Sequence, residues 1–111
     1  MDLNNLLKKL TDIDKAFKEN NPEYEKDIDK AKLGRMVKLT EEVGELADEV
    51  LANQGLQRDD KMAAKQKGDL GDEFGDVFNS LMLLGIKLDL DLVAVISARV
   101  DAMHKRYTNR D

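Results

Sequence analysis

The sequence predicts an all-α fold, a bundle of four helices that forms a single domain over residues 1–111. Apolar residues recur along most of the chain at three- and four-residue spacing, and no stretch sustains the two-residue alternation of a strand. Pro22 is the only proline, and aromatic residues make up 5% of the chain. The length of 111 residues is ordinary for one domain.

Each predicted helix is bounded by residues that commonly start or stop helices. The first helix ends before Pro22, and a connector of about ten residues follows it. Gly55 follows the second helix, where glycine readily adopts the left-handed conformation of a helix stop. Asp89 or Asp91 is expected to cap the fourth helix. The four helices are predicted at about residues 3–18, 31–53, 69–87 and 90–108.

Apolar stripes on these helices are expected to face the core. The second helix contributes Leu33, Met36, Val37, Thr40, Val43, Ala47, Val50 and Leu51. The third contributes Leu70, Phe74, Val77, Phe78, Leu81 and Leu84. The fourth contributes Leu92, Ile96, Val100, Met103 and Tyr107, and Val93 and Val95 widen its stripe. A monomer would expose part of this apolar surface, so the sequence predicts a homo-oligomer, with a dimer as the simplest form.

Composition excludes several classes of protein. The chain has no cysteine and a single histidine, His104, which excludes disulfide frameworks, thiolate chemistry and the usual zinc sites. A formal net charge of −5 argues against a nucleic-acid-binding surface. The N-terminus lacks a signal-peptide core, and no apolar run is long enough to span a bilayer. We therefore expect a cytoplasmic protein with no nucleic-acid or membrane partner, in which catalysis rests on carboxylates.

Two predicted helical segments concentrate acids without counter-charges. Five acids and no Lys or Arg lie between Leu39 and Gln57, and four acids and no Lys or Arg lie between Gly68 and Ile86. Surface helices normally mix both signs, because like charges four residues apart destabilise a helix by about 0.3 kcal/mol. A bound cation would supply the missing counter-charge, and two acidic surface helices without a ligand are the alternative.

The spacing of the acids selects four of them. Glu42 and Glu45 lie three residues apart on one helix face, and Glu73 and Asp76 repeat this spacing on the next predicted helix. Both pairs border apolar residues, so they are expected to be partly buried, and a partly buried carboxylate must be paired, protonated or bound to metal. Oxygen ligands from facing helices suit Mg²⁺, with Mn²⁺ as a substitute.

Two glycines lie inside the acidic segments. Gly44 and Gly75 each cost about 1 kcal/mol relative to alanine in a helix interior. A close approach of two helix backbones would explain both residues and would bring the two carboxylate pairs within range of one ion. Fortuitous glycines on acidic surface helices are the alternative.

The acids fall into two recognisable motifs. The segment Glu41-Glu42-Val43-Gly44-Glu45 is followed, after 27 intervening residues, by Glu73-Phe74-Gly75-Asp76. These segments resemble the EExxE and ExxD motifs of the MazG-like all-α nucleoside triphosphate pyrophosphohydrolases, and the resemblance extends from the second predicted helix to the end of the chain. It implies a single Mg²⁺-dependent helical domain that forms a homodimer or homotetramer. Such a domain hydrolyses (d)NTPs, non-canonical ones included, to the monophosphate and pyrophosphate.

The resemblance also implies roles for individual acids. Glu41 is similar to the family's helper acid, and either Glu41 or Glu45 is expected to orient or deprotonate the attacking water. A magnesium ion would neutralise charge that develops on the phosphates. Glu49 is expected to be a solvated acid or one that supports the ligands from behind. The metal ligands of the family fall on the four acids that the helix spacing selects, namely Glu42, Glu45, Glu73 and Asp76.

Candidate substrate contacts each carry an alternative. Lys38, one turn before Glu42, either touches phosphate or pairs with that acid, and Asn79 either reads a base or ribose edge or belongs to a helix interface. The family commonly uses an asparagine and a basic residue on the last helix to contact phosphate, but Asp101 or Met103 occupies the asparagine position here. The basic candidates, whose alternative is a solvated basic C-terminus, are Arg99, Lys105 and Arg106.

The segment between the two acidic helices is rich in basic residues. Residues 54–68 carry four Lys or Arg residues against two aspartates. This composition predicts either a lid that closes over the triphosphate or an ordinary solvated linker.

Besides a pyrophosphohydrolase, two other functions agree with the sequence. One is a non-catalytic helical module, regulatory or interaction-mediating, that retains the carboxylate cation site. The other is a partner-binding bundle with acidic faces and no metal.

Overall fold

The computed structural model describes residues 1–55 and 69–108 of the chain. All regular secondary structure in these residues is helical, which confirms the all-α prediction. The four predicted helices are present, and one additional short helix lies in the predicted connector. In chain order they are α1 (Leu3–Asn20), α2 (Pro22–Glu25), α3 (Ile28–Asn53), α5 (Asp69–Lys87) and α6 (Leu92–Thr108). Within these ranges, no helix combines the length and apolar character needed to cross a membrane.

Capping interactions set the helix ends. α3 begins at Ile28, three residues earlier than predicted, because the Asp27 carboxylate accepts backbone hydrogen bonds of 3.1 and 3.2 Å from the first turn. Gly55, with a φ of 71°, follows the end of α3 as predicted. Asp91 caps α6 by accepting a hydrogen bond of 3.2 Å from its first turn. Asp89 instead occupies the left-handed position after α5, with a φ of 55°.

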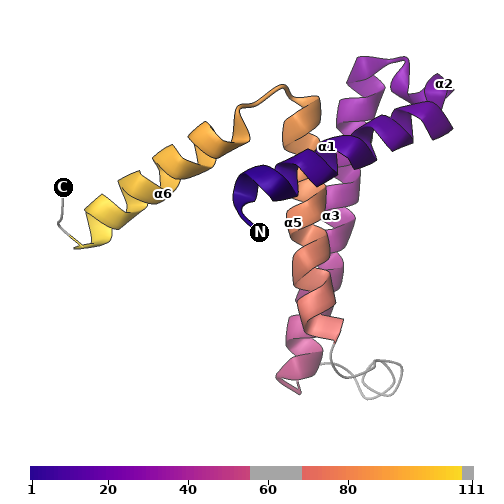
Figure 1. The fold of residues 1–111 in the computed structure, drawn as a ribbon. Helices are drawn as coiled ribbons and strands as arrows, with labels where there is room; N and C mark the ends of the chain where they lie inside the picture. The colour runs from indigo at the N-terminus through magenta and orange to yellow at the C-terminus, as the bar shows by residue number, and fades with distance from the viewer. Residues whose placement is uncertain (56–68, 109–111) are drawn as a thin grey trace.

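The helices form one close pair, a crossing helix and a projecting helix. α3 and α5 lie side by side and antiparallel, and α1 crosses both of them (Figure 1). α6 runs away from the α3/α5 pair. Its start packs closely on α5, because a Cβ atom at Gly85 would come within 2.5 Å of the Leu92 side chain. The core comprises Leu10, Met82, Leu83 and Leu92, with Leu7, Phe78, Ile86 and Ile96 packed against it.

The apolar stripe of α3 does not face this core, so that prediction is wrong. α3 buries Ala31, Glu42 and Glu49 instead, on the face that meets its neighbours. The polar and apolar stripes of α3 lie on different sides of the helix. Because the polar side packs against the neighbouring helices, the apolar side is exposed. The residues of the predicted α3 stripe that are large, apolar and exposed are Leu33, Met36, Val37, Val43, Val50 and Leu51.

The predicted stripes of α5 and α6 are buried only in part. Leu92 is buried and Ile96 packs against the core, but the rest of the α6 stripe extends beyond the other helices. On α5, Phe74 and Leu81 face solvent rather than the core. The exposed apolar residues of α6 are Val95, Val100, Met103 and Tyr107.

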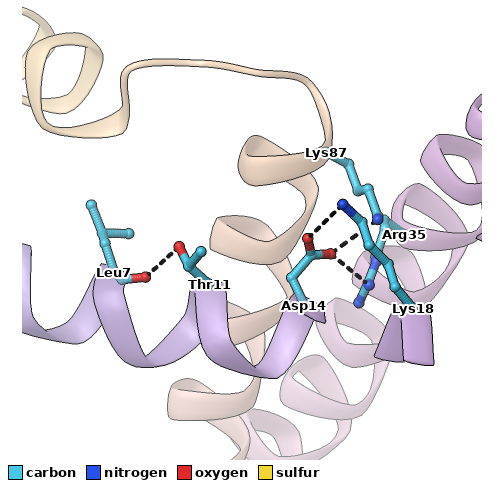
Figure 2. Close-up of polar contacts among 6 residues, drawn as sticks. All are labelled: Leu7, Thr11, Asp14, Lys18, Arg35 and Lys87. Atoms are coloured by element: carbon cyan, nitrogen blue, oxygen red, sulfur yellow. Dashed lines mark hydrogen bonds and ion pairs between the residues drawn. The ribbon is translucent and has the colours of Figure 1, made fainter. Parts of the chain in front are cut away.

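A buried carboxylate attaches α1 to the helix pair. Oδ1 of Asp14 lies 3.1 Å from Nη2 of Arg35 on α3 and 3.1 Å from Nζ of Lys87 at the end of α5 (Figure 2). Nζ of Lys18, one turn along α1, lies 3.7 Å from Oδ2. The side chains of Asp14, Arg35 and Lys87 are 6%, 11% and 2% exposed, so solvent screens the ion pairs among them only weakly.

Replacement of Asp14 by alanine is expected to lower the free energy of unfolding by about 3 kcal/mol, because it removes the carboxylate that two buried cations share. Urea titration followed by circular dichroism measures the change. Asp12→Ala alters an exposed acid on the same helix and should cost less than about 0.5 kcal/mol. Equal stability of the two variants would mean that these ion pairs do not hold α1 in place.

Candidate metal centre

Three carboxylates from α3 and α5 converge on one point. Glu42 extends from the middle of α3, while Glu73 and Asp76 extend from the first half of α5. One oxygen of each carboxylate lies within 4.8 Å of the other two. Glu42 is buried, Glu73 is half-buried and Asp76 is exposed, so the group is open to solvent on one side. The structure thus brings together three of the four acids that the helix spacing selects.

Each of the two inner carboxylates, those of Glu42 and Glu73, has one buried oxygen that lacks a hydrogen-bond partner among the described residues. Oε1 of Glu42 lies 3.1 Å from Nζ of Lys38, so this acid has one protein counter-charge. Oε2 of Glu42 and Oε2 of Glu73 are buried and accept no hydrogen bond. Buried polar atoms without a partner are costly and rare. A cation between the carboxylates would satisfy both oxygens, and oxygen donors of this kind suit Mg²⁺ or Mn²⁺.

Burial and the neighbouring carboxylates raise the pKa of Glu73. Desolvation by burial, followed by the negative charges of Glu45, Glu42 and Asp76, raises the pKa of this carboxyl to about 7. A hydrogen bond with Glu42 acts in the same direction, and it can form only when one of the two carboxyls carries a proton. Glu73 therefore keeps its proton to a higher pH than an ordinary glutamate does. A cation and a proton compete for the same oxygens.

Three other acids of α3 surround this group. Glu45, the fourth predicted ligand, is exposed and is not one of the three grouped carboxylates, although its charge contributes to the raised pKa of Glu73. Glu41 is exposed, with Oε2 at 3.9 Å from Nζ of Lys38. Glu49 is buried, so the expectation of a solvated acid is wrong for this residue. The other expectation, that it supports the ligands from behind, stays a prediction.

The two glycines of the acidic motifs do not mark a close helix approach. A Cβ atom built at Gly44 or at Gly75 would meet nothing within 4 Å. The prediction that these glycines let two backbones come together is therefore wrong.

The predicted substrate contacts fall in different places. Lys38 lies beside the carboxylates, and the pKa of its ammonium is raised chiefly by a hydrogen bond to Glu42, so the pairing that was one of its two predicted roles is present. Asn79 is exposed on α5. The basic residues of α6 are exposed on the helix that projects from the α3/α5 pair: Arg99, Lys105 and Arg106.

A pocket beside the carboxylates was missed by sequence reasoning. It lies between α1, α3 and α5, and its lining residues are Phe17, Arg35, Lys38, Ser80 and Leu83. Arg35, Lys38 and Glu42 are spaced at three and four residues and so share one face of α3. That polar stripe was a signal for the pocket, but α1 supplies the opposite wall and no local pattern indicates this contact.

The basic segment between the acidic helices was predicted as a lid or a linker over residues 54–68. Residues 56–68 lie outside the described residues, so both alternatives stay predictions.

Comparison with known proteins gives no relative, since no family model, curated protein or solved structure matches this chain. The carboxylate group and the adjacent pocket are therefore the observations on which a function rests.

The raised pKa of Glu73 predicts a pH dependence of stability in the metal-free protein. Between about pH 4.5 and pH 7 the folded state retains a proton that the unfolded state has released, so stability falls as the pH rises through this window. Glu73→Gln cannot lose a proton and should be more stable than the wild type at pH 8 in EDTA, with a smaller advantage at pH 5. Urea titrations at the two pH values measure the difference.

Glu19→Gln, an exposed change on α1, is the control for that experiment and should track the wild type at both pH values. An advantage of Glu73→Gln that is equal at pH 5 and pH 8 would contradict the raised pKa.

Proposed function

We propose that the protein is a Mg²⁺-dependent nucleoside triphosphate pyrophosphohydrolase that removes (d)NTPs, non-canonical ones among them, from the nucleotide pool. The observation that carries this proposal is the convergence of Glu42, Glu73 and Asp76, two of which have a buried oxygen without a hydrogen-bond partner among the described residues. The same acids form the motifs that resemble those of the MazG-like family. A cation held there by oxygen ligands alone suits the handling of phosphate groups.

The reaction consists of one hydrolytic step. The oxygen of water forms a bond to the α-phosphorus, and the bond from this phosphorus to the oxygen that bridges to the β-phosphorus breaks. Pyrophosphate leaves, and the nucleoside monophosphate remains. A bound Mg²⁺ supplies neutralisation of the charge that accumulates on the phosphate oxygens.

The chain's own residues position the water and the phosphates. Glu41 or Glu45, both exposed beside the carboxylate group, accepts the proton that the water releases. Lys38 is held at 3.1 Å from Glu42 and borders the pocket, so its ammonium is placed to meet a phosphate oxygen at the edge of the site. Glu42, Glu73 and Asp76 would hold the cation, and Glu45 would be a fourth acid that a ligand-bound state recruits.

The exposed apolar surfaces support a homo-oligomer, either a dimer or a tetramer. The radius of gyration is 17.2 Å, whereas a compact chain of about 110 residues has a value of about 13 Å. The stripe of α3 and the outer residues of the α6 stripe are exposed in the part of the chain that the structure describes. A second copy that buries these stripes would remove apolar surface of a kind that monomers rarely expose.

A non-catalytic module that retains the cation site is the alternative function. The position of Arg99, Lys105 and Arg106 favours it, because these residues lie on a helix that projects from the carboxylate-bearing pair. Such a module would bind Mg²⁺ and gain thermal stability from it by mass action, but it would release no pyrophosphate.

Pyrophosphate release from a panel of (d)NTPs tests the catalytic proposal. Release should require Mg²⁺ and stop in EDTA, and Glu42→Gln, Glu73→Gln and Asp76→Asn should each lower kcat by at least about 100-fold, because each removes a ligand charge at constant volume. Asp72→Asn changes an exposed acid on the same helix and should retain most activity. Near-wild-type activity in two of the three ligand variants at saturating Mg²⁺ would refute the site. A raised melting temperature in Mg²⁺ without any turnover would favour the non-catalytic module.

Light scattering tests the oligomeric state. At micromolar concentration the wild type should have a mass of at least twice the 12.5 kDa of one chain. Val37→Glu places a charge in the exposed apolar stripe of α3 and should shift the population toward the monomer, whereas Asn4→Glu adds the same charge at an exposed polar position and should not. A sharp wild-type peak near 12.5 kDa would contradict the proposal.

A further inference from the structure

The exposed apolar stripes of α3 and α6 are of matching length. On α3 the exposed residues extend from Leu33 to Leu51, and on α6 they extend from Val95 to Tyr107. At the helical rise per residue these stripes are about 27 Å and about 18 Å long, so the stripe of α6 fits within that of α3. Contiguous exposed apolar surface is typical of sites where proteins associate.

The fold keeps the two stripes apart within one chain. The start of α6 is anchored on α5, where Leu92 packs against Gly85, and the rest of the helix runs away from the α3/α5 pair (Figure 1). The outer residues of α6 and the stripe of α3 are both exposed in the described residues. Contact between these two stripes therefore needs α6 of one copy and α3 of another.

Basic residues border the stripe of α6. Arg99 and Arg106 are seven residues apart, so they lie on one face of the helix, along one edge of the apolar stripe. Both are exposed, and the central carbon of the Arg106 guanidinium lies 5.0 Å from the centre of the Tyr107 ring. We call Arg99 and Arg106 the edge arginines. They place positive charge directly beside exposed apolar surface.

Acids border the stripe of α3. Glu41 lies one turn beyond Val37 of the stripe, Glu45 lies one turn further, and both acids are exposed. We call Glu41 and Glu45 the rim acids, because on the helix surface they lie between the apolar stripe and Glu42 of the candidate metal centre. The chain between Leu39 and Gln57 contains no Lys or Arg, so this edge of α3 has no basic residue of its own.

We propose that α6 of a second copy packs along the apolar stripe of α3 and places its edge arginines against the rim acids. The two stripes match in apolar character, and their borders carry opposite charges, which is the pattern that decides which helices pair. Twofold symmetry repeats the contact, so each chain gives its α6 to the other chain and receives one in return.

This exchange of α6 makes the candidate metal centre a site of two chains. The edge arginines of one copy supply the counter-charge that the acidic edge of the other copy lacks in its own segment. They also bring positive charge to the rim of the carboxylate group, where phosphate oxygens lie under the proposed function. The role toward phosphate rests on the proposed function, whereas the contact between the helices does not.

Charge reversal on the two sides of the contact tests the proposal by light scattering in EDTA. One variant carries Arg99→Glu and Arg106→Glu, and the other carries Glu41→Arg and Glu45→Arg. Each variant alone should dissociate at a concentration about tenfold higher than the wild type, because like charges then meet in both contacts. An equimolar mixture should recover the oligomer, since each α6 then meets an α3 of opposite charge.

A variant with Lys9→Glu and Lys105→Glu is the control. It reverses as many basic residues as the first variant, but at exposed positions on α1 and on the face of α6 opposite the stripe, and it should associate like the wild type. A mixture that does not recover would overturn the proposal. Wild-type association of the α3 variant would indicate pairing of α6 with α6, and wild-type association of the α6 variant would indicate pairing of α3 with α3. Either result would also overturn it.

A nitroxide label locates the contact while leaving its charges in place, and it decides the matter if a reversed variant does not fold. The chain has no cysteine, so Asp101→Cys, outside the stripe of α6, can carry a single label. In mixed oligomers with isotope-enriched wild type, this label should broaden the amide signals of α3 around Glu41. The same label at Asp12→Cys on α1 should broaden them less. Broadening confined to α6, or none, would overturn the proposal.

The outcomes also separate this contact from the proposed function. Recovery of the oligomer in the mixture, without pyrophosphate release by the wild type from any triphosphate, would reject the enzyme and retain the contact. Pyrophosphate release by the wild type, with no recovery in the mixture, would reject the contact alone.

Discussion

α3, the longest helix of the described residues, buries charged side chains where it packs on its neighbours. Glu42 and Glu49 are the buried acids of α3. Glu73 of α5 lies next to Glu42, so two carboxylates face each other across a helix interface. Such an arrangement is unfavourable unless a proton or a cation occupies the space between the oxygens. The raised pKa of Glu73 and the two buried oxygens without donors are two expressions of this single constraint.

The remaining features of the fold follow from this polar interface. α3 packs through the face that carries Arg35, Glu42 and Glu49, and its apolar stripe is exposed. α1 crosses the pair, and there Asp14 joins Arg35 and Lys87. Because Arg35 also lines the pocket, the ion pairs that attach α1 contribute to a wall of that pocket. Under the proposed function, the exposed stripe of α3 is the surface that a second copy of the chain would cover.

The features that the sequence alone predicts are the local ones, which depend on residues close together in the chain. Helix positions and the spacing of Glu42, Glu73 and Asp76 follow from short-range periodicity, because residues three and four apart share a face whatever the tertiary contacts are. The inward face of α3 could not be predicted, since its polar and apolar stripes are equally regular and only the neighbouring helices decide between them. Asp14 carried a signal, as a lone acid in the apolar stripe of its helix, but its two buried partners, Arg35 and Lys87, lie 21 residues or more away.

The proposed function depends on a divalent cation between the carboxylates of α3 and α5. Anomalous diffraction from crystals grown with Mn²⁺ tests it most directly, because the signal locates the ion itself. If the site is as proposed, we expect an anomalous peak about 2.0 to 2.4 Å from oxygens of Glu42, Glu73 and Asp76, at the position that Mg²⁺ would also take. A Mn²⁺-saturated crystal with no peak at these oxygens would contradict it.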